Sequence, residues 1–204
     1  MPAIPPLPAP LEEKGFALRF SAERDIPEIL IAHQDDPHLY ARLGLERAPS
    51  GAELGQELER VEAERAAGSR ATLTLVQPPL DACRGQVYVH SIDWRHARGS
   101  LGIWVAPQAR GRGLARRALR LVAGWLFRSV GLERVALLTE PDNEPMLRAA
   151  LAAGFVREGR LRSYGREGGR RIDLVLLSLL PEDLAPPGGG QAVAFSSERE
   201  EGLA

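Results

Sequence analysis

Two glycines and two arginines stand together between a short apolar segment and a helical pattern. The apolar segment ends at Val105, and Arg110-Gly111-Arg112-Gly113 follows after a turn. Apolar residues then recur at helical spacing, at Leu114, Ala118, Leu121, Val122 and Trp125. A strand, a glycine loop and a helix start, in this order, present converging backbone N–H groups to an anion. We therefore expect a phosphate-binding loop, with Arg110 and Arg112 adding charge-assisted contacts.

Other phosphate-binding loops fit these residues less well. In a dinucleotide-binding Rossmann unit the first glycine follows its strand almost at once, whereas residues 106–110 separate Val105 from Gly111 here. A Walker loop needs Gly-Lys-Ser/Thr, and Lys14 is the only lysine in the chain. A tight loop that needs small residues for its geometry alone is the remaining alternative.

The run from Gln108 to Ala115 resembles the pyrophosphate loop, Gln/Arg-x-x-Gly-x-Gly/Ala, of the GNAT family of N-acetyltransferases, which bind acetyl coenzyme A. Gly-Ile-Trp-Val at 102–105 is similar to the fourth strand of that family. Glu-Pro-Asp-Asn at 140–143, followed by a helix into Gly154-Phe155, is similar to its second conserved block. The resemblance covers residues 16–180 and is closest to the branch that includes the ribosomal-protein alanine N-acetyltransferases.

This resemblance implies a mixed α/β fold with the element order β-α-α-β-β-β-α-β-α-β-β. In that fold the strands at 100–105 and 133–139 diverge and leave a V-shaped slot for the pantetheine arm. The coenzyme-binding positions it implies are the backbone of Trp104, Val105 and Ala106, the loop residues Arg110, Gly111, Arg112, Gly113, Leu114 and Ala115, and the side chain of Asn143. For Asn143, the N-cap of the following helix is the alternative role.

The sequence departs from the family at the catalytic acid and base. Many relatives carry a Glu where this chain has Ser100, and a Ser near the sulfur where it has Met146. The candidate replacements are Glu140 and His90 as the base and Tyr164 as the acid for the departing thiolate. For each of these three, a purely structural role is the alternative.

Amine basicity narrows the choice of acceptor. An α-amino group with a pKa of about 8 is roughly 10% neutral at pH 7, whereas a lysine amine is neutral about one time in 2,500. We expect an enzyme that moves an acetyl group directly from acetyl coenzyme A to a protein N-terminal α-amine or a small-molecule amine, without a metal. A catalytically silent coenzyme A-binding regulatory module is the alternative, and a nucleotide-cofactor oxidoreductase is a more remote one.

The composition indicates one domain with a net charge close to zero. The 204 residues are 44% hydrophobic with a net charge of −1, which favours neither a nucleic acid nor a membrane as partner. One cysteine, Cys83, excludes an intrachain disulfide and fits a reducing compartment, and the N-terminus lacks a signal-peptide pattern. We expect a cytoplasmic protein, and the sequence leaves open whether it forms a homodimer.

Periodicity and caps divide the chain into a proline-rich arm at 1–14 that lies outside the fold, the acetyltransferase domain at 15–184 and a disordered tail at 185–204. Ser21 is expected to cap a helix to His33, and Ser50 with Glu53 forms a capping box for a helix to Ala67. Residues 35–49 are expected to be irregular. The other expected elements are strands at 16–20, 70–76 and 85–92, a helix at 143–153, and a hairpin with strands at 155–164 and 170–179.

Overall fold

The computed structural model describes residues 3–7, 9–13 and 15–184. Eight strands form one sheet in the order β1-β2-β3-β4-β5-β6-β8-β7. They are β1 (Leu11–Glu13), β2 (Phe16–Phe20), β3 (Ala71–Gln77), β4 (Leu80–Asp93), β5 (Arg98–Val105), β6 (Arg134–Thr139), β7 (Val156–Glu167) and β8 (Arg170–Leu179). Neighbouring strands are antiparallel except β5 and β6, which run parallel. The mixed α/β fold predicted from the sequence is confirmed.

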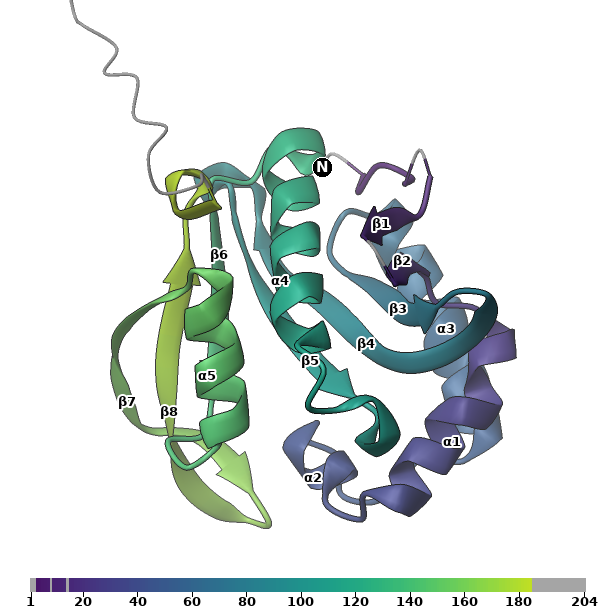
Figure 1. Ribbon diagram of the computed structural model, residues 1–204. Helices are drawn as coiled ribbons and strands as arrows, with labels where there is room; N and C mark the ends of the chain where they lie inside the picture. Colours follow the sequence, from purple (N-terminus) through teal and green to yellow (C-terminus); the bar gives the residue numbers. More distant parts are fainter. Residues whose placement is uncertain (1–2, 8, 14, 185–204) are drawn as a thin grey trace, which may run out of the picture.

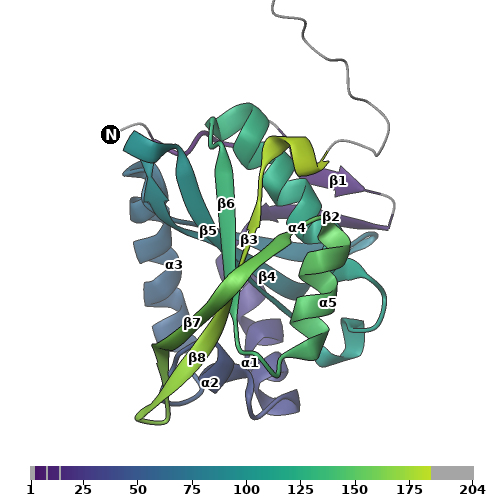
Figure 2. The ribbon, with the colours of Figure 1, turned by 90° about the vertical axis from the view of Figure 1, so that its left-hand side faces the viewer.

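Helices cover both faces of this sheet. They are α1 (Ile26–Asp35), α2 (Leu39–Arg42), α3 (Gly51–Ala66), α4 (Leu114–Trp125), which continues as a π-helical turn at Leu126–Val130, and α5 (Glu144–Ala153). Helices α4 and α5 pack side by side on one face, and α1 and α3 lie against β4 and β3 on the other (Figures 1 and 2). Among the described residues, no helix combines the length and apolar character needed to cross a membrane.

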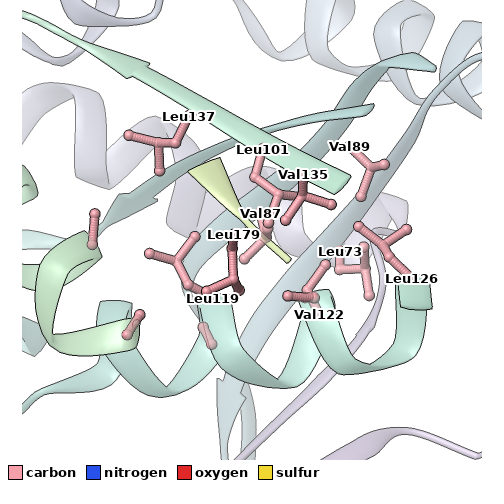
Figure 3. Packing of buried hydrophobic residues seen from close by; sticks show 14 of the residues in the cluster. Leu73, Val87, Val89, Leu101, Leu119, Val122, Leu126, Val135, Leu137 and Leu179 are labelled. Carbon is pink, nitrogen blue, oxygen red and sulfur yellow. The ribbon is translucent and has the colours of Figure 1, made fainter. Parts of the chain in front are cut away.

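The core lies between α4 and the sheet and fixes the start of α4 relative to β5. Leu119, Val122 and Leu126 of this helical segment are fully buried (Figure 3). They face side chains of the central strands, which include Leu73, Val87, Val89 and Leu101. Burying each such side chain is worth about 2 kcal/mol. This packing therefore holds the glycine loop that precedes α4 in a fixed place at the end of β5.

Several local predictions are confirmed. Ser50 caps α3 with its hydroxyl oxygen, and the Glu53 carboxylate accepts the Ser50 N–H at 2.8 Å, as a capping box requires. Helix α5 ends at Gly154, which has a φ of +103°. The predicted tail at 185–204 lies outside the described residues.

Tertiary contacts overturn three local expectations. Ser21 does not cap a helix: its Oγ lies 2.8 Å from Thr74 Oγ1, and α1 begins only after a 3-10 turn at Glu23–Asp25. The segment expected to be irregular contains α2. The arm expected to lie outside the fold is partly in it, because β1 pairs with β2 and Ile4 is 1% exposed. These elements form because neighbouring parts of the fold supply backbone partners and apolar surface.

Candidate active site

Strands β5 and β6 pair only over their first four residues. Their register runs from Arg98–Arg134 to Leu101–Leu137, and beyond that point neither strand pairs with the other. The two strands separate toward the end where α2 lies (Figure 1). A cavity of about 840 Å³ occupies this region. Its walls include the ends of β5 and β6, the glycine loop, the first turns of α4 and α5, and helix α2.

The backbone of β5 is open toward the cavity. The N–H of Ala106 donates to Arg84 O on β4 at 2.9 Å. In an antiparallel ladder, residues alternate between hydrogen-bonded and non-hydrogen-bonded positions. The N–H and C=O groups of Ile103 and Val105 therefore point away from β4, into the gap that β6 has left. Trp104 and Ala106 point their backbone groups toward β4, so Val105 is the member of the predicted trio that offers its backbone to the slot.

The glycine loop has the conformation that an anion site requires. Gly111 and Gly113 have φ values of +76° and +69°, and a Cβ at either would meet no atom within 4 Å. Gly113 is the N-cap of α4, whose first turn receives no side-chain cap. The N–H groups at Leu114 and Ala115 therefore stand at an open, positively polarised helix end. Packing does not demand the glycines, whereas their positive φ values do, and the absence of a Cβ leaves the loop open to a ligand.

Positive charge surrounds this loop. Arg110 and Arg116 line the cavity, and Arg112 is exposed in the loop itself. Within the described part of the chain, Arg112 and Arg116 have no carboxylate within ion-pair distance. Arginines beside free helix N–H groups fit a diphosphate, because each adds charge-assisted hydrogen bonds to phosphate oxygens.

The Arg110 side chain bridges the two sides of the slot mouth. Its Nε donates to Val105 O at 2.8 Å, and its Nη2 donates to Asp36 Oδ2 at 2.6 Å. Asp36 ends α1 and is 8% exposed. Burial alone would raise the pKa of Asp36, but the hydrogen bond and charge of Arg110 hold that pKa below its ordinary value. The carboxylate is thus ionised at neutral pH.

Glu140 and Asn143 lie together at the end of β6. Both line the cavity, as does Met146 on α5. Glu140 Oε2 accepts a hydrogen bond from Thr139 Oγ1 at 3.2 Å. Glu140 is the one predicted catalytic residue that the structure places at the slot. Asn143 has the helix-capping role weighed for it and also lines the slot, whereas its contact with the coenzyme stays a prediction.

His90 and Tyr164, the other two predicted catalytic residues, lie elsewhere. His90 is half-buried on β4, its Nδ1 lies 3.0 Å from Ser91 Oγ, and burial with the nearby Arg70 charge lowers its pKa. Tyr164 is 59% exposed on β7. Neither lines the cavity. Cys83 is buried, and burial raises its pKa to about 12, so it is no nucleophile at neutral pH.

The cavity wall formed by β4 and α2 contains Tyr88, which sequence reasoning missed, and residues of the segment that was expected to be irregular. Tyr88 and the residues of α2, among them His38 and Arg42, line the cavity. Tyr88 OH accepts a hydrogen bond from Trp104 Nε1 at 2.9 Å. Its alternation with the buried Val87 and Val89 could have placed it on the face away from α4. Helix α2 has four residues and no periodic pattern that could have revealed it.

Comparison with known proteins agrees with this geometry. The family described as acetyltransferase (GNAT) domain matches residues 16–156. The uncharacterized N-acetyltransferase p20 of Bacillus licheniformis is 23% identical over 163 residues, which are 80% of this chain and 92% of that protein.

Solved structures share the fold at low identity. Ribosomal-protein-S5-alanine acetyltransferase from Vibrio fischeri has a TM-score of 0.75 and 22% identity, over 87% of this chain and 100% of that one. Spermidine N-acetyltransferase from Vibrio cholerae, in complex with CoA and spermine, has a TM-score of 0.72 and 20% identity, over 84% of this chain and 99% of that one. The family match, which spans the slot and its glycine loop, shows that this chain belongs to the GNAT family of acetyltransferases.

Proposed function

We propose that this chain transfers an acetyl group from acetyl coenzyme A to the α-amine of a protein N-terminus. The observation that carries the proposal is the continuous path from the open backbone of β5 to the uncapped start of α4. A pantetheine arm pairs with the N–H and C=O groups that Ile103 presents to the gap, much as an added strand would, and the Val105 N–H is left for the thioester. The diphosphate binds the N–H groups of the loop between Arg110 and Ala115.

The proposed reaction is direct transfer within a ternary complex. The neutral amine nitrogen forms a bond to the thioester carbonyl carbon, and the Val105 N–H stabilises the oxyanion that develops. The C–S bond then breaks, and coenzyme A leaves as a thiolate whose pKa of about 8.5 makes it a tolerable leaving group without a dedicated acid. Glu140 takes the proton that the attacking nitrogen loses, directly or through one water. Proximity in the slot supplies much of the rate.

The choice of an α-amine rests on the groups that the slot offers. Its lining includes Glu140 but neither of the two groups common in relatives, because Ser100 and Met146 occupy those positions. A weak base suffices for an amine that is about one-tenth neutral at pH 7, and hardly for a lysine. The names of the relatives support amine acceptors of two kinds, a ribosomal-protein alanine and spermidine. A small-molecule amine is thus the second candidate acceptor.

A single-turnover assay with an amine panel tests the proposal. The panel consists of an alanine-initiated peptide, the same peptide with a blocked N-terminus and one internal lysine, and spermidine. We expect acetyl transfer to the first peptide at least about tenfold faster than to the other two. Faster transfer to spermidine or to the lysine would overturn the acceptor assignment. Coenzyme binding with background thioester consumption would support the silent regulatory module, which the missing family groups favour.

A further inference from the structure

An ion pair between Asp36 and Arg110, which are 74 residues apart in the sequence, joins the α1–α2 segment to the glycine loop. Asp36 lies between α1 and α2, and α2 lines the cavity, whereas Arg110 belongs to the glycine loop. The Asp36 side chain is 10% exposed and the Arg110 side chain 43%. One end of this ion pair is therefore fixed in the protein, and the other reaches into the slot.

Asp36 is itself held from two sides. Its Oδ1 accepts the His38 N–H at 3.2 Å, and its own N–H donates to Ala32 O at 3.0 Å. Leu39, three residues on, is 2% exposed and packs in one cluster with Ala106 and with Trp104, which lines the slot. The carboxylate position is thus set by α1, α2 and β5 together.

The Arg110 guanidinium has donors to spare. It carries five N–H groups, of which Val105 O and Asp36 use one each. Three remain for an anion at the adjacent loop. A free arginine loses about 2 kcal/mol of rotamer entropy when it is fixed. The two existing hydrogen bonds of Arg110 therefore reduce the entropy cost of binding a diphosphate.

Building on the proposed function, we propose that Asp36 is a positioning residue for coenzyme A: it holds Arg110 against Val105 O and aims its free donors at the diphosphate. The same contact links the glycine loop to the α1–α2 segment, so a coenzyme that fixes Arg110 also restrains residues 36–43.

The sign of the change in coenzyme A affinity in Asp36→Asn distinguishes this proposal from simple charge repulsion. The substitution keeps an oxygen for the His38 N–H and removes the charge that holds Arg110. Removing a carboxylate near a diphosphate should by itself tighten coenzyme binding, because like charges repel. Loss of positioning should weaken it. We expect the coenzyme A dissociation constant, measured by titration calorimetry, to rise about fivefold.

Arg110→Gln and the double variant complete a double-mutant cycle with Asp36→Asn. Arg110→Gln should weaken binding by at least as much, and Asp36→Asn should add no further loss in that background. Asp35→Asn is the matched control, since this exposed neighbour has no ion pair with another described residue. We expect Asp35→Asn to change binding less than twofold. If Asp36→Asn fails to fold, Arg110→Lys replaces it in the test. A lysine cannot reach Val105 O and Asp36 with two fixed donors, so this variant should lose coenzyme A affinity by a similar factor.

Amide hydrogen exchange tests the coupling. Coenzyme A should slow exchange over residues 36–43 in the wild-type chain and leave it unchanged in Arg110→Gln. Unchanged or tighter binding in Asp36→Asn, or no protection of residues 36–43 in a wild-type chain that binds coenzyme A, would overturn this inference alone. A wild-type chain that binds no coenzyme A would overturn the proposed function as well.

Discussion

The Nδ2 atom of Asn143 lies 3.4 Å from Oε2 of Glu140, while its Oδ1 accepts the Met146 N–H at 3.3 Å. One side chain therefore caps α5 and contacts the carboxylate that we propose as the base. The two roles use different atoms, so different substitutions separate them.

Asn143→Ala removes both contacts, whereas Asn143→Ser keeps a capping oxygen and loses only the contact to Glu140. We expect the alanine variant to lose about 1 kcal/mol of unfolding free energy and the serine variant only a few tenths. Both should lower kcat by a similar factor if the amide orients Glu140. Thermal unfolding and steady-state kinetics measure the two effects. Full activity in the serine variant would show that Asn143 is only a helix cap.

Gly111→Glu places a carboxylate at the expected diphosphate position. The new side chain meets no neighbouring atom, but the backbone at Gly111 is strained for any residue other than glycine, and the added charge repels the coenzyme. We expect coenzyme A affinity to fall at least tenfold, or about 1.4 kcal/mol. Gly131→Glu is the matched control, because Gly131 also has a positive φ, of +84°, and open space around it, at the far end of the α4 segment. Equal titration curves for both variants would contradict a diphosphate at the loop.

His90→Gln and Tyr164→Phe test the predicted acid and base that lie outside the cavity. Because neither side chain lines the slot, we expect each variant to keep kcat/KM within about twofold of the wild type. Glu140→Gln, assayed beside them, should lower kcat by about a hundredfold if Glu140 is the base. A large loss in either of the first two variants would assign them a role that this arrangement does not provide.

Asp25 should dominate the fall in unfolding free energy at acidic pH. It is fully buried, and Arg19 donates to both of its oxygens, at 2.9 and 2.7 Å. Burial alone would raise the pKa of Asp25, but hydrogen bonds from Arg19, Thr74 and Ala22 hold it below the ordinary value. Its stabilising effect is therefore present above the unfolded-state pKa of about 3.9 and is lost as pH falls through the lower folded-state pKa.

We expect Asp25→Asn to cost about 3 kcal/mol at pH 7, because it leaves a largely buried guanidinium with only the half-exposed Asp81 as its charged partner. The dependence of unfolding free energy on pH below 4 should flatten in this variant. Asp81→Asn is the control: Asp81 also pairs with Arg19, but its side chain is 48% exposed, so its loss should cost less than about 1 kcal/mol. Urea unfolding between pH 2 and pH 7 measures both, and similar losses for the two variants would contradict the role given to burial.

The sequence by itself determined the features that local chemistry controls. The glycine loop and the apolar stripe of α4, the Ser50–Glu53 capping box and the Gly154 helix end depend on residues within a few positions of one another, so their spacing predicts them. The family resemblance added the order of the strands and the existence of the slot.

Only the tertiary structure decided which side chains meet at that slot. Glu140 lines it while His90 and Tyr164 do not, because the strand register and the face of each residue place them. The Asp36–Arg110 pair and helix α2 were not predictable, since residues far apart in the chain meet only when the sheet and both helical layers pack together. Local periodicity carries no information about such contacts.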